Sequence, residues 1–194
     1  MAAHAGLTVE RITRAAAELA DRVGIEKVTV SALARQFGVK DASFYSHVKN
    51  LQEIRVRVAL LASDELNQAL AAAIAGRSGG EALTAFADAY RDYALAHPGR
   101  YAATQLPLDP AEFTDTAVFA RSVELTYAVM RHYRLAEPDL TDAARLLRST
   151  FHGFIGIESA GGFNHPRAAA DSWRRITTGL HHLLANWPPE PPAP

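Results

Sequence analysis

The chain has 194 residues, of which 48% are hydrophobic, and it contains no cysteine. This length and composition allow a substantial core and exclude disulfides, thiolate zinc sites and cysteine nucleophiles, and no apolar run approaches the ~20 residues that span a membrane. The net charge of -1 is unevenly distributed. Residues 1–57 carry nine Lys and Arg against six Asp and Glu, a net of +3, and the remainder is acidic. This division is typical of a DNA-facing part joined to an acidic body.

A first helix is predicted from residue 9 to residue 23, and a second, shorter one over residues 30–37. In both, apolar residues recur at three- and four-residue spacing, so that one face of each helix can be buried. The two stripes consist of Val9, Ile12, Ala16, Leu19 and Val23, and of Val30, Leu33, Ala34 and Phe37. Gly24 and Gly38 are expected to end these helices because glycine adopts a left-handed conformation at no steric cost. Val39 is expected to pack as an apolar plug between the second helix and the next.

A third helix is predicted from Lys40 to about Val48, which completes a helix-turn-helix. Phe44 and Val48 can face inward together, whereas the other side chains are mostly cationic, hydroxyl-bearing or imidazole-bearing. In a helix-turn-helix the second helix enters the major groove with its N-terminal residues at the base edges. The residues predicted to contact DNA are Lys40, Ala42 and Ser43 at the bases, and Tyr45, His47 and Lys49 at the backbone. The alternative interpretation is a solvated face of an ordinary three-helix core.

A long amphipathic helix is predicted from Leu51 to the glycine-rich stretch at residues 76–80. It begins next to the helix-turn-helix and ends in the rest of the chain. A helix shared in this way can act as a lever, because tilting it would move the recognition helix.

The remainder of the chain is also predicted to be helical, over residues 81–97, 113–130, 139–160 and 168–185. The helix at 139–160 carries apolar residues almost all round, as expected for burial on two faces. One face can line the interior and the other a partner subunit. The residues predicted in such a dimer interface are Leu146, Gly153, Ile157, Ile176, Leu180 and Leu184. The alternative is that both C-terminal helices belong to a monomeric core.

The N-terminal segment resembles the DNA-binding domain of the TetR/AcrR family of bacterial transcriptional regulators. The shared features are the first helix, Thr29-Val30 at the start of the second, Leu33-Ala34 within it, Gly38-Val39 at the turn and Tyr45-Ser46-His47. The resemblance implies that Thr29 caps the second helix and contacts a phosphate, since a threonine oxygen can accept from the first free amides of a helix.

Three positions depart from the family pattern. Leu51 stands where many members carry a lysine, so a phosphate contact expected there is absent. Lys40 occupies a position where a short polar cap is common, and Asp41 beside it would repel a nearby phosphate. An unusual half-site sequence is therefore expected.

The C-terminal part resembles the TetR-like domain named for its Trp, His and Gly positions. The motifs are His97-Pro-Gly-Arg-Tyr101, His152-Gly-Phe154, Ala160-Gly-Gly-Phe163 and Trp173. The resemblance implies an all-α fold of about nine helices. It also implies a homodimer on a palindromic operator, with half-sites on the order of 34 to 36 Å apart, and a small-molecule effector whose binding releases DNA. Repression is the family default.

The predicted organisation follows from these resemblances. A helix-turn-helix DNA-binding domain spans residues 1–56, an effector-binding and dimerisation domain spans 57–187, and a flexible Pro-rich tail spans 188–194. The candidate effector contacts are the aromatic residues expected to face the interior, with one histidine: Phe86, Tyr90, Tyr93, Tyr127, Phe151 and His152. An apolar or aromatic effector suits them. Such residues are also common in plain helical cores, and this alternative stays open.

No metal or cofactor is expected, because His181 and His182 are adjacent and point in different directions on a helix. An enzyme is disfavoured because the sequence has no nucleophile elbow, dinucleotide loop or paired-carboxylate spacing. The predicted function is a ligand-responsive repressor, and the alternative is a helical interaction or ligand-binding protein without sequence-specific DNA binding. The lack of cysteine and of a recognisable signal peptide predicts a cytoplasmic location, on the nucleoid when bound to the operator and not in a membrane.

Overall fold

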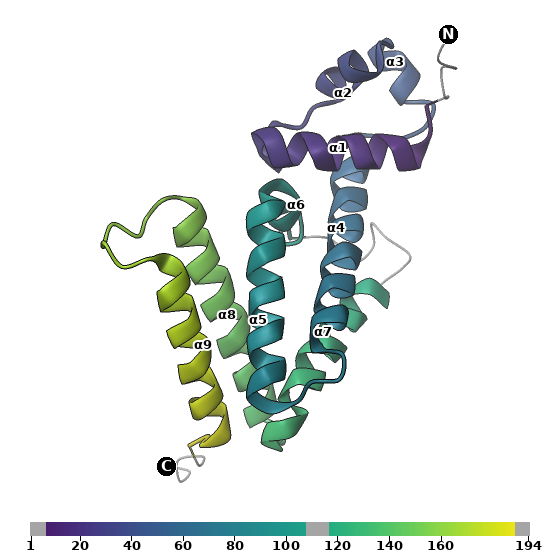
Figure 1. Ribbon diagram of the computed structural model, residues 1–194. Coiled ribbons are helices and arrows are strands. Elements are labelled where there is room, and N and C mark those ends of the chain that lie inside the picture. Colours follow the sequence, from purple (N-terminus) through teal and green to yellow (C-terminus); the bar gives the residue numbers. More distant parts are fainter. Residues whose placement is uncertain (1–6, 108–116, 189–194) are drawn as a thin grey trace, which may run out of the picture. The chain divides into compact units, whose positions relative to one another are not determined.

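The computed structural model describes residues 7–107 and 117–188, and these contain helices and no strands. The all-α fold predicted from the sequence is therefore confirmed (Figure 1). The helices are α1 (Val9–Val23), α2 (Val30–Phe37), α3 (Asp41–Phe44), α4 (Leu51–Ile74), α5 (Gly79–Ala96), α6 (Pro98–Ala103), α7 (Ala117–Met130), α8 (Asp139–Ser159) and α9 (Ala169–Ala185). Phe113 and the end of the Pro-rich tail lie outside the described residues.

The chain forms two compact units. The first unit comprises residues 1–67 and 96–120, and the second comprises residues 68–95 and 121–194. Helix α4 begins in the first unit and ends in the second. The DNA-binding domain at residues 1–56 stays a prediction. The first compact unit is larger than this range, because it also includes α6 and more of α4.

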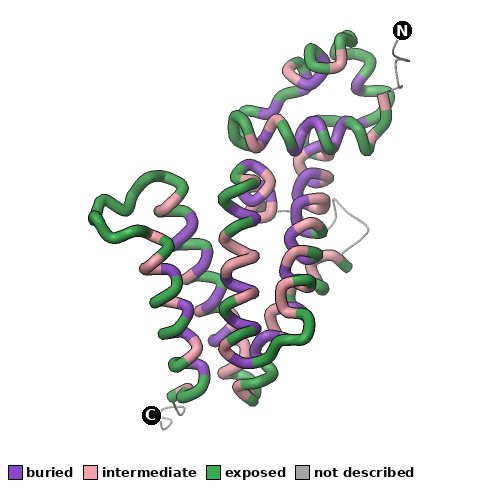
Figure 2. The backbone as a smooth tube through the Cα atoms, viewed as in Figure 1, coloured by how far each residue is buried: buried purple, intermediate pink, exposed green. Residues whose placement is uncertain are grey.

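The core of the first unit is formed by apolar side chains from α1 to α4. Ile12, Leu33, Phe44 and Ile54, one from each helix, are all fully buried. Buried purple segments recur along α1 and α4 in Figure 2. The predicted inward positions of Phe44 and Val48 are confirmed, and they hold the short third helix on the core.

Two apolar residues of this unit lie at the surface, where the sequence analysis was wrong. Val23 is 41% exposed, because it is the last residue of α1 and alanines take the buried positions before it. Val39 is 37% exposed and does not act as a plug. The rings of Phe37 and Phe44 meet edge to face at 5.8 Å and make the contact between α2 and α3.

The third helix is shorter than predicted. It spans Asp41–Phe44, and residues 45–47 form a turn. The Ser46 hydroxyl donates to the Ser43 carbonyl at 2.8 Å, the kind of local bond that competes with a continuing helix. Val48 nevertheless stays attached to this turn, since its backbone N–H donates to the Phe44 carbonyl at 3.0 Å.

The second unit packs α5, α8 and α9 around a core of large side chains, with the end of α7 also buried. Leu83, Phe151, Ile155, Trp173 and Leu184 are each at most 2% exposed. In Figure 1, α8 and α9 lie side by side, joined by the loop at residues 160–168. The two faces predicted for α8 are present, one buried and the other carrying Gly153 and Ile157 at the surface.

Candidate nucleic-acid interface

Helix α2, the first helix of the motif, is held at both ends as the sequence predicts. The Thr29 hydroxyl accepts a hydrogen bond from the backbone N–H of Ala32 at 3.2 Å, which confirms its role as a helix cap. Gly38 has a φ of 68°, in the left-handed region, and the Val39 N–H then reaches the Ala34 carbonyl at 3.0 Å. These bonds fix where the chain leaves α2 and enters α3.

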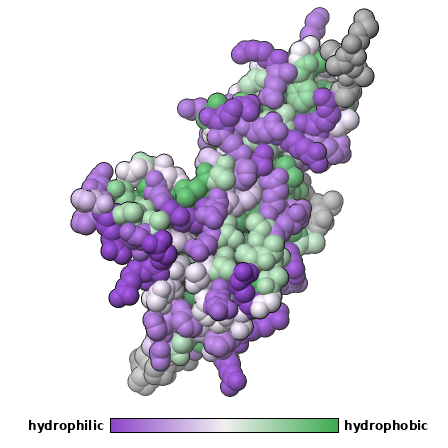
Figure 3. Space-filling model, in the orientation of Figure 1, coloured by the Kyte–Doolittle hydropathy of each residue, from purple (hydrophilic) through white to green (hydrophobic). Residues whose placement is uncertain are grey.

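All seven side chains predicted to contact DNA are exposed on the first unit. They are Thr29, Lys40, Ala42, Ser43, Tyr45, His47 and Lys49. Tyr45 is 56% exposed although it follows the fully buried Phe44. In the view of Figure 3, hydrophilic atoms cover most of the first unit. Neither Lys40 nor Lys49 forms an ion pair within the part of the chain that the structure describes, so both cations can meet phosphates.

The start of α4 holds the backbone of Lys49 in place. The Glu53 carboxylate accepts from the Lys49 N–H at 2.7 Å, and the Asn50 side-chain oxygen accepts from the Glu53 N–H at 2.8 Å. Arg57 donates to the other Glu53 oxygen at 2.8 and 2.9 Å. The backbone hydrogen bond from Lys49, followed by Arg57, lowers the pKa of Glu53. The Asn50-x-x-Glu53 spacing is a capping signal that the sequence analysis missed.

A second polar contact missed from the sequence links α2 to α3. The Ser31 hydroxyl donates to an oxygen of the Asp41 carboxylate, and both residues are exposed. Helices α2 and α3 are therefore joined by this polar contact as well as by the Phe37–Phe44 ring contact.

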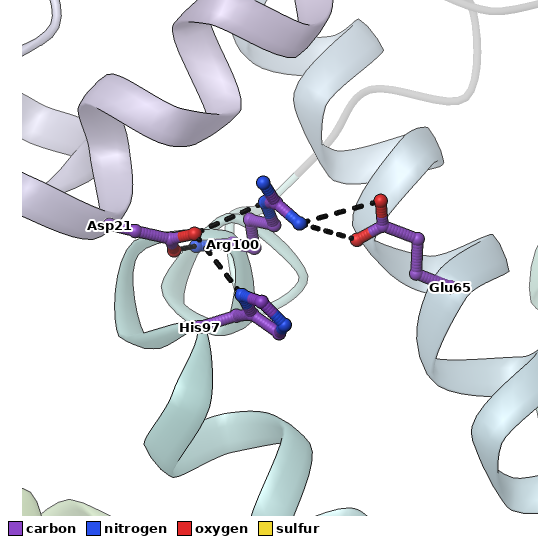
Figure 4. Close-up of polar contacts among 4 residues, drawn as sticks. All are labelled: Asp21, Glu65, His97 and Arg100. Atoms are coloured by element: carbon purple, nitrogen blue, oxygen red, sulfur yellow. Dashed lines mark hydrogen bonds and ion pairs between the residues drawn. The ribbon is translucent and has the colours of Figure 1, made fainter.

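Helix α6, to which the sequence analysis assigned no structure, joins α1 to α4 within the first unit (Figure 4). Asp21 of α1 accepts from the Arg100 backbone N–H at 2.8 Å, and the guanidinium of Arg100 lies 3.1 Å from Asp21 and 3.2 Å from Glu65 of α4. His97 lies 3.4 Å from the same aspartate. Helix α6 can approach α1 this closely because residue 99 is glycine. A Cβ on Gly99 would lie 2.0 Å from the Ala20 backbone.

The second unit brings together three of the predicted effector contacts. The ring centroids of Phe86, Tyr90 and Phe151 lie 5.7 to 6.4 Å apart, and Phe151 also meets Trp173 at 5.3 Å. Tyr93 is buried and Tyr127 half-buried. His152 is exposed, so its predicted place in the interior is wrong. It follows buried Phe151 by one position, about 100° further around α8.

Polar side chains also contact this aromatic cluster through Trp173. The Arg91 guanidinium forms an ion pair with Glu158, with both side chains 16% exposed, and lies 5.9 Å from the Trp173 ring. The Trp173 indole N–H donates to Asp88 at 2.9 Å. The hydrogen bonds to Glu158 raise the pKa of Arg91. No local sequence pattern predicts these contacts, because the paired residues are 67 and 85 positions apart.

The residues predicted in a dimer interface divide into two groups. Gly153 is exposed, Ile157 is 48% exposed, and Leu146 and Ile176 are half-buried. Leu180 and Leu184 are 7% and 1% exposed, so they belong to the core of the chain itself and their assignment was wrong. They continue the buried stripe of α9 that begins at Trp173, whereas Leu183 is 41% exposed on another side.

The described residues lack a cluster of metal-ligating side chains and a membrane-spanning helix. None of their His, Asp and Glu side chains form a group of three or more suited to a metal ion. None of their helices has the length and apolar character needed to cross a bilayer.

Comparison with protein families identifies the chain. A model described as bacterial regulatory proteins of the tetR family matches residues 12–55, and one described as a tetracyclin repressor-like C-terminal domain matches residues 83–180, half of the chain. The chain belongs to the tetR family of bacterial transcriptional regulators. The resemblance stated from the sequence is confirmed, as is its prediction of a DNA-binding transcriptional regulator.

Relatives of this tetR family protein cover most of its length. It is 36% identical to the HTH-type transcriptional regulator Rv0681 of Mycobacterium tuberculosis, over 81% of this chain and 72% of that protein. It is 31% identical to the HTH-type transcriptional regulator YobS of Bacillus subtilis, over 96% of this chain and 97% of that one. A structure of BioQ with its double-stranded DNA operator is 22% identical, with a TM-score of 0.64 over 91% of this chain and 99% of that one.

Proposed function

We propose that this tetR family regulator binds a palindromic operator as a homodimer, represses transcription in the bacterial cytoplasm, and is released by an apolar or aromatic small molecule. The observation that carries operator binding is the exposed set from Lys40 to Lys49, mounted on buried Phe44 and Val48. Its cations, hydroxyls and imidazole suit phosphates and base edges. The fold likeness to BioQ, which has been solved with its double-stranded DNA operator, supports operator binding by this chain.

The test of the DNA face is binding of the full chain to the DNA that flanks its own gene, measured by anisotropy at several salt concentrations. The double variant Tyr45→Ala with Lys49→Ala is expected to bind about tenfold or more weakly. Its salt slope is expected to fall by about 1, for the lost lysine–phosphate contact. The control is Arg121→Ala, which removes an exposed cation of the second unit. Wild-type affinity of the double variant would contradict the placement of the DNA face.

The dimer is proposed to form on the exposed side of α8 and α9. Ile157 and Leu183 expose apolar surface there, and a Cβ on Gly153, Gly156 or Gly179 would have no neighbour within 4 Å in this chain. Such a surface lets a second copy approach closely. Two such helices from each subunit would make a four-helix interface.

A graded substitution tests this surface. Gly156→Ala and Gly156→Gln both have open space in the single chain, so neither strains its own packing. Sedimentation is expected to show a dimer for wild type and for Gly156→Ala, and a monomer for Gly156→Gln, whose side chain blocks close approach. A dimer of unchanged stability in Gly156→Gln would contradict this interface.

The effector is proposed to bind at the aromatic cluster of Phe86, Tyr90 and Phe151, where Arg91 and Asp88 supply charge. A screen of small metabolites should yield a compound that raises the unfolding temperature and releases DNA. Tyr90→Ala is expected to bind DNA normally and to lose this response. A broad screen without any such compound, or a full response in Tyr90→Ala, would contradict this site.

A further inference from the structure

The hydrogen bond between Ser31 and Asp41 is the feature of the DNA face that the proposed contacts leave unused. Ser31 lies in the first turn of α2 and Asp41 is the first residue of α3, and both are exposed. The side chain of Lys40 makes no capping bond to α3. The Ser31 contact is therefore what fixes the Asp41 carboxylate at the end of α3 that enters the groove.

A carboxylate at this position needs a partner other than phosphate. Its negative charge is repelled by the DNA backbone, so it cannot serve as a positioning contact. One oxygen accepts from Ser31, and the other accepts no hydrogen bond from the described part of the chain. A fixed acceptor of this kind is suited to a base that presents a donor.

The major groove presents two amino donors. Adenine N6 lies beside the N7 acceptor, which repels a carboxylate, whereas cytosine N4 has no acceptor of its own base next to it. A carboxylate therefore favours cytosine. The charge-assisted bond from Ser31 removes much of the rotational freedom of Asp41 before DNA binds, which lowers the entropy cost of the contact.

Resting on the proposed operator binding, we propose that Asp41 determines specificity by accepting a hydrogen bond from the amino group of one cytosine in each half-site. Ser31 is the positioning residue that orients its carboxylate. The competing interpretation is that the Ser31–Asp41 bond only fastens α2 to α3, a task that the Phe37–Phe44 contact already performs.

The test is selection of binding sites from random double-stranded DNA by the full chain, followed by sequencing. Wild type is expected to require a cytosine at one position of each half-site. Asp41→Ala should reduce the preference for cytosine at that position about tenfold and leave the base preferences at the other positions unchanged. Asp41→Asn should shift it toward adenine, because an amide pairs with adenine N6 and N7. The control is Glu18→Gln, which makes the same charge change on an exposed face of α1 and should select the wild-type site.

Variants of Ser31 separate positioning from a merely structural role. Ser31→Ala should reduce the cytosine preference about threefold at unchanged unfolding temperature, and Ser31→Thr, which keeps the hydroxyl, should restore it. A lower unfolding temperature of Ser31→Ala with an unchanged base preference would show that the bond is structural, and it would overturn the role of Ser31.

Two outcomes would overturn the role of Asp41 alone, and a third would overturn operator binding as well. If the Asp41 variants select the wild-type site, or if Glu18→Gln changes selection as they do, Asp41 does not read a base. If wild type selects no sequence at all, operator binding itself fails, and the inference falls with it.

Discussion

The helix-turn-helix of the first unit and the second unit place their polar side chains in opposite ways. In the helix-turn-helix of the first unit, apolar residues fill the core and the DNA-contact candidates all lie outside, so adjacent Phe44 and Tyr45 have separate tasks. In the second unit, Arg91 and Asp88 contact Trp173, and Arg91 also pairs with Glu158, so polar and apolar contacts form one cluster. Substitutions on the exposed face of the helix-turn-helix should therefore change DNA binding without changing stability. Substitutions in the cluster of the second unit should change polar contacts and stability together.

The largest effect is expected from Phe44→Ala, which tests that separation when it is compared with Tyr45→Ala. Removing a fully buried phenylalanine costs about 3–5 kcal/mol, through lost apolar burial and the cavity left behind. The free energy of unfolding in urea should fall by this amount for the first unit, and DNA binding should be lost with it.

Tyr45→Ala is the matched control, one position further along the chain. Because Tyr45 is 56% exposed, its removal should change the free energy of unfolding by less than about 0.5 kcal/mol while DNA binding weakens. Comparable destabilisation by the two substitutions would contradict the separation of core and DNA face.

Gly99→Ala is expected to have the next largest effect, at the one place described here where the first unit mixes close packing with ion pairs. The new Cβ would lie 2.0 Å from backbone atoms of Ala20, which cannot move aside as a side chain could. Helices α1 and α6 must separate, which should cost about 3 kcal/mol. Thermal unfolding measures it, and Gly156→Ala, with open space around its Cβ, should not destabilise the chain.

The coupling in the second unit is tested by Arg91→Met, which leaves Glu158 partly buried without its cation. With both side chains 16% exposed, the expected loss is about 2 kcal/mol, between the values for exposed and fully buried pairs. The double variant with Glu158→Met should be more stable than Arg91→Met alone, since no uncompensated charge remains. Additive losses in the double-mutant cycle would contradict the coupling.

Much of the first unit could be predicted from the sequence, because its signals are local. The Thr29 cap, the Gly38 turn and the burial of Phe44 and Val48 each depend on neighbours within a few residues. The wrong predictions in this unit concern features that hydrophobic spacing alone does not determine. Val39 and the length of α3 depend on the Phe37 ring and the Ser46 hydroxyl, whose contacts a spacing pattern does not reveal.

The second unit was predictable as helices but less so as a site. Helix α8 was placed to within a residue, yet His152 and the pair Leu180 and Leu184 were assigned to the wrong sides. Which face of a helix meets its neighbour depends on packing between segments far apart in sequence. The Arg91–Glu158 pair is of the same kind, since no local pattern joins positions 67 residues apart.

The smallest effect concerns Tyr133, a half-buried polar group of the second unit. Burial raises its pKa from 10.0 to about 12, and its hydroxyl lies 2.9 Å from Nδ1 of His181. The neutral phenol is favoured in the folded chain, whereas the unfolded chain ionises near pH 10. Its contribution to stability is therefore complete below pH 10 and is lost as the pH rises through about 12. The expected loss is on the order of 1 kcal/mol, because the ring is only half-buried.

Tyr133→Phe is the variant that isolates this pH dependence. The difference from wild type at pH 8 measures the lost hydrogen bond with His181, and any further change between pH 10 and 12 measures ionisation. Wild type should lose more stability than the variant over that interval. Parallel curves would show that Tyr133 ionises as readily in the folded chain as in the unfolded one. This polar group would then lie outside the coupling of polar contacts and stability that sets the second unit apart from the first.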